Sequence, residues 1–152
     1  MIVLGVDPGT ATTGYGVIDK TGHKFSCLDV GVIETPAGMN LEERLEIIFE
    51  GLKKIIKKHH PDKIGVELLF FSSNVKTAMS VGQARGVVLL AAAKNQLPLF
   101  EFTPPQVKQA VCGYGAADKK QVQKMVAAIL GLKEIPKPDD AADALAIAVC
   151  VA

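Results

Sequence analysis

The hydrophobic periodicity of this chain changes once, about a quarter of the way along, and the change limits the folds it can adopt. Before it, three β-type segments at residues 2–7, 13–20 and 23–35 are joined by tight, glycine-containing turns. After it, helical patterns alternate with strands at residues 62–67 and 97–102. Short connections predict an antiparallel meander, whereas helix–strand alternation predicts parallel pairing. We therefore expect an α/β fold with a mixed five-stranded sheet flanked by helices.

Five segments have helical periodicity and begin or end with residues typical of helix termini. They lie at residues 40–60, about 75–95, about 104–113, 118–130 and 139–152. Asn40 and Glu43 resemble a capping box at the start of the first helix. Asp118, with Gln121 three residues on, is suited to cap the fourth helix, and Asp139 is suited to cap the fifth. No linker or repeat separates these elements, so we expect one domain over residues 1–152.

The composition indicates a globular protein, since 49% of the 152 residues are hydrophobic and 22% are charged. The net charge of +1 does not by itself indicate a nucleic-acid-binding protein, although a local patch of lysines can still bind phosphates. The three cysteines lack C-x-x-C spacing, which favours free thiols over a zinc site. We find no secretory signal and no apolar run near the ~20 residues of a membrane span. We therefore expect a cytoplasmic protein that is not bound to membranes.

Acidic residues occupy the ends of two predicted strands and the start of the last helix. Asp7 ends the first strand and Glu67 ends the fourth, so parallel pairing would bring both carboxylates to one edge of the sheet. Asp140 and Asp143 share one face of the last helix, whose N-terminus can pack near the same edge. The spacing alone does not decide between Asp139 and Asp140 as the second acid of that pair. Each motif by itself is also compatible with an ordinary turn or helix cap.

Four converging carboxylates would repel one another and have raised pKa values unless a cation neutralised them. The candidate ligands are all hard oxygens, without histidine or cysteine, so the expected metal is Mg²⁺ or Mn²⁺. Two such ions can activate water and stabilise the leaving oxygen of a phosphodiester. The set of acids therefore predicts a metal-dependent phosphodiester hydrolase.

The stretch "DPGTATTGYG" after the first strand also resembles the phosphate-binding hairpin of the actin and sugar-kinase ATPases. Those proteins need two domains that close on the nucleotide and a second hairpin of this kind. We find no second D-x-G-T turn, and 152 residues do not accommodate both domains. The metal-binding interpretation of the stretch is therefore favoured.

Four motifs along the chain carry a family resemblance: "GVDPGTATTGYGVI", "GQARGVVLLAAA", "PPQVKQAVCGYGAADKKQVQKMV" and "DDAADALAIA". In order and spacing they resemble the RuvC family of Holliday-junction resolvases over essentially the whole chain. The resemblance implies an RNase H-like fold and a homodimer that cuts two strands of a four-way DNA junction at symmetric positions, leaving 5′-phosphate ends. It also implies two Mg²⁺ ions per active site, with Mn²⁺ as a plausible substitute, and a branch-migration complex of the RuvA and RuvB type as partner. The alternative is a related RNase H-like nuclease that acts on RNA or RNA–DNA hybrids.

The resemblance also assigns roles to individual residues, and it favours Asp140 over Asp139 as a ligand. The implied catalytic metal ligands are Asp7, Glu67, Asp140 and Asp143. The implied nucleic-acid contacts are Phe70, Phe71, Lys76, Lys108, Lys119, Lys120 and Lys124. The two aromatic residues would stack on unpaired bases, although packing beneath their own loop is the simpler interpretation. Without the resemblance, most of these lysines would be assigned to the solvated surface.

Two features of the middle of the chain remain open. Gly82 and Gly86 lie four residues apart on one helix, where a second backbone can approach closely. They could pack against the chain's own sheet, whereas the resemblance places this helix at the dimer interface. Leu68 stands where the family commonly has Gln, which puts in doubt a polar contact from this loop and the sequence preference at cleavage.

Overall fold

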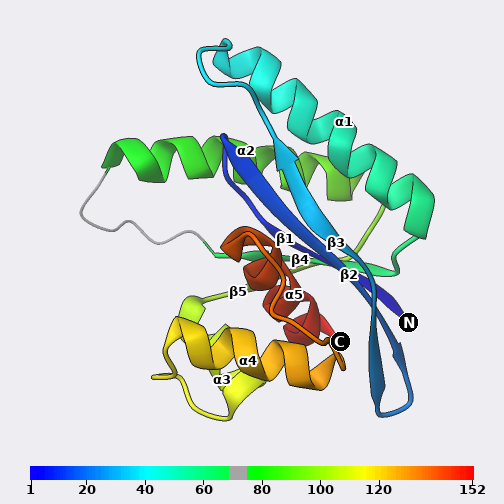
Figure 1. The fold of residues 1–152 in the computed structure, drawn as a ribbon. Helices are drawn as coiled ribbons and strands as arrows, with labels where there is room; N and C mark the ends of the chain where they lie inside the picture. The colour runs from blue at the N-terminus through cyan, green and yellow to red at the C-terminus, as the bar shows by residue number, and fades with distance from the viewer. Residues whose placement is uncertain (69–74) are drawn as a thin grey trace.

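The computed structural model describes residues 1–68 and 75–152, which form a single sheet with helices on both faces (Figure 1). The elements follow one another in the order β1 (Ile2–Asp7), β2 (Thr12–Thr21), β3 (Lys24–Glu34), α1 (Leu41–His59), β4 (Lys63–Glu67), α2 (Val75–Lys94), β5 (Leu99–Phe102), α3 (Pro104–Cys112), α4 (Lys119–Ile129) and α5 (Asp139–Val151). None of the helices in these two described ranges has the length and apolar character needed to cross a membrane.

The five strands have the order β3-β2-β1-β4-β5. β2 is antiparallel to both β1 and β3, whereas β4 is parallel to both β1 and β5. The predicted meander, the mixed sheet and the parallel pairing of the first and fourth strands are therefore confirmed. Val6 is opposite Val66 in the parallel pair, so Asp7 and Glu67 follow these partners at the same edge of the sheet.

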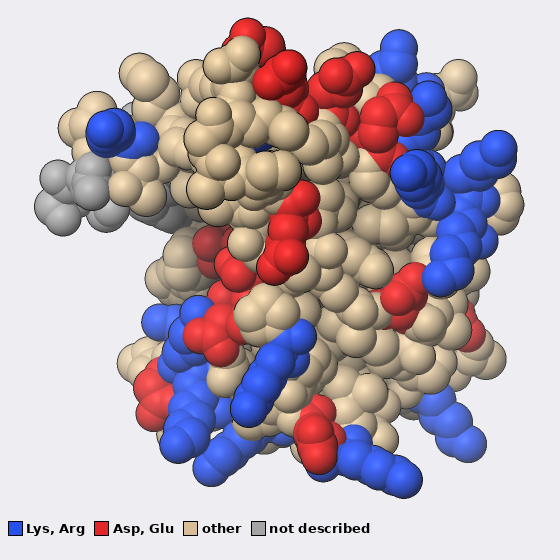
Figure 2. Space-filling model, turned by 45° about the horizontal axis from the view of Figure 1, so that its top comes forward, with Lys and Arg blue, Asp and Glu red and all other residues tan. Residues whose placement is uncertain are grey.

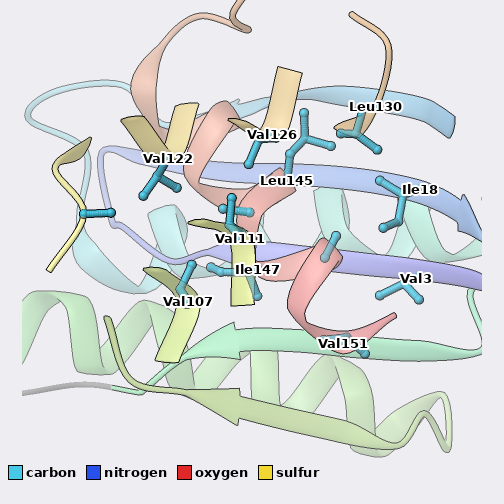
Figure 3. Packing of buried hydrophobic residues seen from close by; sticks show 13 residues of the cluster. Val3, Ile18, Val107, Val111, Val122, Val126, Leu130, Leu145, Ile147 and Val151 are labelled. Carbon is cyan, nitrogen blue, oxygen red and sulfur yellow. The ribbon is translucent and has the colours of Figure 1, made fainter. Parts of the chain in front are cut away.

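The helices divide into two layers, with α1 and α2 on one face of the sheet and α3, α4 and α5 on the other (Figure 1). α5 lies directly on the sheet, and α3 and α4 cover its outer side. Figure 3 shows the resulting core, in which apolar residues of α3 and α4 pack with those of α5, β1 and β2. α5 is thus enclosed by the sheet on one side and by α3 and α4 on the other.

Two glycines allow α5 to lie against the backbone of the sheet. A Cβ added at Gly5 in β1 would lie 2.1 Å from the Ala144 carbonyl oxygen, and one at Gly14 in β2 would lie 1.9 Å from the Asp140 carbonyl oxygen. No larger residue fits at either position without moving the helix. Because Gly14 pairs with Asp7 in the sheet, the same close approach brings the start of α5 next to the Asp7 carboxylate.

The caps of the first and fourth helices differ from each other. Asp118 forms the predicted capping box with Gln121: its carboxylate accepts from the Gln121 backbone N–H at 2.8 Å, and its own N–H donates to Gln121 Oε1 at 2.9 Å. The prediction for Asn40 is wrong, because its side chain makes no capping hydrogen bond. The first turn of α1 is exposed, so water can satisfy its free N–H groups.

The predicted cap of the last helix is also wrong. Pro138 occupies the N-cap position of α5, and Asp139 is already the first helical residue. The Asp139 side chain instead turns toward α4, where it accepts a hydrogen bond from Gln123 Nε2 at 3.1 Å. Packing between α4 and α5 has therefore replaced a local cap with a tertiary contact.

Candidate active site

The four acids predicted as metal ligands come from three elements that meet at one edge of the sheet. β1 supplies Asp7, β4 supplies Glu67, and the first turns of α5 supply Asp140 and Asp143. Burial, followed by repulsion from the other three carboxylates, raises the pKa of Asp7 to about 8. The Asp140 carboxyl group is one of the neighbours that raise the pKa of Asp7. The other three acids are therefore close enough to Asp7 to oppose its ionisation.

The pKa values of two of the other acids, Glu67 and Asp143, are also raised. Burial, and then repulsion from Asp143, raises the pKa of Glu67. Burial also raises the pKa of Asp143, although the nearby Lys119 ammonium opposes this shift. The expectation that a shared site raises carboxyl pKa values is thus confirmed at Asp7, Glu67 and Asp143.

A cleft of about 250 Å³ lies between the end of β4 and helices α3, α4 and α5. Two acids and two bases line it, namely Glu67, Asp143, Lys108 and Lys119. Its remaining lining is largely apolar and includes Val107, Val122 and Ile147. Charges in such a partly enclosed site are less screened than charges on an open surface.

Lys119 contacts one acid of this cleft, Asp143, and also Asp139, which lies outside the cleft lining. Its Nζ lies 3.1 Å from Asp143 Oδ2 and 3.4 Å from Asp139 Oδ2. Burial lowers the pKa of Lys119, but the contacts with Asp143 and then Asp139 outweigh burial, so that the pKa is raised. The sequence did not predict this role for Asp139, which depends on how α4 packs on α5.

The donor chemistry of the site fits a hard divalent cation. All four candidate ligands are carboxylates, and their mutual repulsion is the free energy that a bound cation would relieve. Among residues 1–68 and 75–152, however, no three His, Cys, Asp or Glu side chains cluster tightly enough to hold a metal in the present arrangement. The Lys119 ammonium is the positive charge beside Asp143. The predicted acids thus lie at one edge of the sheet, but their side chains do not form a complete coordination site in this arrangement.

The predicted nucleic-acid contacts lie in different surroundings. Lys108 and Lys119 line the cleft, whereas Lys120 and Lys124 are exposed on α4 and Lys76 is exposed on the first turn of α2. On the face of the molecule shown in Figure 2, Lys and Arg side chains gather along the lower part, with acidic side chains above and beside them. Phe70 and Phe71 lie outside the described residues.

The outer face of α2 carries an apolar stripe made of Val75, Met79, Gly86 and Leu90, with Gly82 beside it. The side chains of Val75, Met79 and Leu90 are 69%, 64% and 53% exposed. These positions fall on one side of the helix because consecutive members are four, seven and four residues apart, and each of these steps is close to whole helical turns. A Cβ added at Gly86 would meet nothing within 4 Å, so this glycine does not serve close packing on the chain's own sheet.

Known proteins share both the sequence and the fold. The family model described as "Crossover junction endodeoxyribonuclease RuvC" matches residues 3–151. Proteins with this name from Clostridioides difficile (strain 630) and Halothermothrix orenii (strain H 168) are 55% and 57% identical to this chain over 150 residues. The alignments cover 99% of this chain and 89% and 91% of those proteins.

Two solved structures give the corresponding comparison of folds. T. thermophilus RuvC in complex with a Holliday junction substrate matches with a TM-score of 0.93 at 40% identity, over 99% of this chain and 92% of that one. The yeast mitochondrial Holliday junction resolvase matches with a TM-score of 0.69 at 15% identity, over 97% of this chain and 76% of that one, which shows a shared fold alone. The five-stranded mixed sheet with its helices is the expected RNase H-like fold. The chain belongs to the RuvC family of crossover junction endodeoxyribonucleases.

Proposed function

We propose that this protein is a divalent-metal-dependent endonuclease that resolves four-way DNA junctions by paired symmetric nicks during recombination and repair. The observation that carries the proposal is the meeting of four carboxylates from β1, β4 and α5 beside the lysines of α3 and α4. The 40% identity to a RuvC protein solved with a Holliday junction supports this substrate over other phosphodiesters.

The acids and the lysines would divide the work of hydrolysis. Asp7, Glu67, Asp140 and Asp143 would hold two Mg²⁺ ions, or Mn²⁺ in their place. When bound, the metal supplies the Lewis acidity that activates a water molecule and stabilises the leaving oxygen. Lys108 would bind the phosphate at the cleft, and cleavage would leave 5′-phosphate and 3′-hydroxyl ends that can be religated.

Lys119 has a separate part in this proposal because it is already paired with an acid of the site. Its ammonium neutralises Asp143 in the arrangement described above. If Asp143 served as a metal ligand, Lys119 Nζ would no longer be needed to neutralise it and could donate a hydrogen bond to a phosphate oxygen at the same cleft. The lysine would thereby hold the substrate only when the acids hold metal.

The remaining DNA contacts follow from the resemblance and from exposure. Lys76, Lys120 and Lys124 would bind backbone phosphates away from the point of cleavage. Phe70 and Phe71 would stack on unpaired bases at the junction centre. Replacing Phe70 or Phe71 by Leu should reduce junction cleavage without changing the affinity for the metal.

The active assembly would be a homodimer built on the outer face of α2. The exposed Val75, Met79 and Leu90 flank a glycine face that another backbone could approach. A twofold dimer matches a substrate cut at two symmetric positions. By family resemblance, we also propose a branch-migration complex of the RuvA and RuvB type as partner and the cytoplasm as location.

A comparison of substrates tests the proposal. A labelled four-way junction, a plain duplex and an RNA–DNA hybrid would each be incubated with the protein in the presence of Mg²⁺ or of a chelator. Symmetric nicks in the junction alone, only with Mg²⁺, are the expected result. Cleavage confined to the hybrid would replace the resolvase assignment with that of an RNase, and nicking in chelator would exclude the metal-dependent mechanism.

A further inference from the structure

The turn that follows Asp7 is tied to the opposite helical layer by side chains that the proposed chemistry does not use. Thr10 Oγ1 lies 2.6 Å from Ser80 Oγ, so a hydrogen bond joins this turn to α2. Both residues are half-buried, which partly shields the two hydroxyls from water. The bond links positions 70 residues apart in the chain, and no local sequence pattern indicates it.

A second set of hydrogen bonds holds the same residue from the side of α1. The buried Thr35 donates its hydroxyl to the Thr10 carbonyl oxygen, and its backbone N–H donates to the Ala11 carbonyl oxygen at 3.0 Å. Arg44 Nε in turn donates to Thr35 Oγ1 at 2.8 Å. Thr10 is therefore held through its carbonyl by Thr35, which Arg44 of α1 contacts. Its hydroxyl is held by Ser80 of α2.

The turn itself is closely packed, so it has little room to absorb a displacement of Thr10. The Thr13 hydroxyl donates to the Gly9 carbonyl oxygen at 2.7 Å. A Cβ added at Gly9 would lie 2.4 Å from the Thr12 carbonyl oxygen. Close-packed segments transmit strain to their neighbours, and Asp7 stands only three residues before Thr10.

We propose that the Thr10–Ser80 pair is a positioning contact that couples the placement of α2 to the placement of the Asp7 carboxylate. α2 carries the exposed apolar stripe at its outer face, so a second copy of the chain docking there acts on the helix that contacts the turn. Docking that shifts α2 also shifts the Asp7 turn. This inference rests on the proposed metal site, because the fit of Asp7 to a cation is the quantity that changes.

The test measures Mn²⁺ affinity of the full chain by isothermal titration calorimetry, together with the Tm, for Thr10→Ala, Ser80→Ala and the double variant. Each single substitution should weaken Mn²⁺ binding about fivefold, as expected for the loss of one hydrogen bond. The double variant should be no weaker than the single ones, because both remove the same contact. Thr10→Ser keeps the hydroxyl and should keep the wild-type affinity. Ser26→Ala, at an exposed serine of β3, is the matched control.

Two kinds of result would contradict the inference, one concerning the Thr10–Ser80 pair and the other concerning the metal site. Unchanged Mn²⁺ affinity in both single variants would overturn it, as would losses that add up in the double variant. A lower Tm with unchanged affinity would reduce the pair to a packing contact. Absence of Mn²⁺ binding by the wild-type chain, or unaltered binding by Asp7→Asn, would instead overturn the proposed metal site and the inference with it.

Discussion

α5 and α2 are both rich in alanine and both mostly apolar, yet the fold uses them in opposite ways. Eight of the 13 residues of α5 are buried, whereas only five of the 20 residues of α2 are. α5 lies between the sheet and two further helices, while α2 covers the sheet with one face (Figure 1). The other face of α2 carries the exposed apolar stripe. An apolar helix that is enclosed completes a core, and one that keeps an exposed stripe is suited to an interface.

The largest expected effect is on the free energy of unfolding, because α5 lies directly against the sheet backbone whereas the outer face of α2 is open. Gly5→Ala places a methyl group 2.1 Å from the Ala144 carbonyl oxygen of α5 and should lower the free energy of unfolding by about 4 kcal/mol. Gly86→Ala enters open space on α2 and should raise the stability of the monomer by up to about 1 kcal/mol. Urea unfolding of both variants measures the contrast. Equal stability of the two variants would contradict the different roles assigned to the two helices.

The second effect concerns the acids at the start of α5. The folded-state pKa of Asp7 is raised from 3.8 to about 8, so the folded chain binds more protons than the unfolded chain between these values. The associated stability is present below about pH 4 and is lost as the pH rises toward 8. We expect a loss of about 3 kcal/mol in chelator, less than the ~1.4 kcal/mol per pKa unit would give, because the carboxylates titrate together.

Unfolding in chelator at about pH 5 and about pH 8 checks this prediction. Mg²⁺ should restore most of the lost stability at the higher pH and have little effect at the lower one, where Asp7 is protonated. Asp7→Asn should flatten the pH dependence. A wild-type chain with the same stability at both pH values in chelator would show that the surrounding acids and burial do not oppose the ionisation of Asp7.

The third and smallest effect concerns the exposed stripe of α2. Leu90→Glu introduces a charge at a position that is 53% exposed and should weaken self-association by about 2 kcal/mol, or roughly thirtyfold. Leu28→Glu is the matched control, because Leu28 is 46% exposed but belongs to β3. Sedimentation equilibrium measures both. If the Leu28 variant dissociates and the Leu90 variant does not, the dimer face lies on β3 instead of α2.

The parts of the fold that the sequence predicted are those with a local signal. Short apolar segments bounded by turn residues indicated the five strands, and the short turns indicated the antiparallel order of the first three. The position of Asp7 and Glu67 at strand ends then placed both at one sheet edge, because parallel neighbours end together. Asp118 and Gln121 formed the predicted capping box for the same reason, since both partners lie within one helical turn.

The parts that the sequence did not predict depend on contacts between distant segments. Asp139 is a residue type typical of helix caps. Because α4 packs beside α5, however, the Asp139 carboxylate accepts a hydrogen bond from Gln123 and forms an ion pair with Lys119. The Thr10–Ser80 hydrogen bond likewise exists only because the turn after β1 meets α2. The local pattern at these residues is the same with or without the contact, so no periodicity or spacing reveals it.

The central claim is that the acids gathered over the end of β1 support metal-dependent cleavage of a four-way junction. Junction binding and junction cleavage by Asp7→Asn, measured side by side in Mg²⁺, test it most directly. We expect a dissociation constant within about threefold of the wild-type value and a cleavage rate lower by at least about a thousandfold. Cleavage within tenfold of the wild-type rate would contradict it.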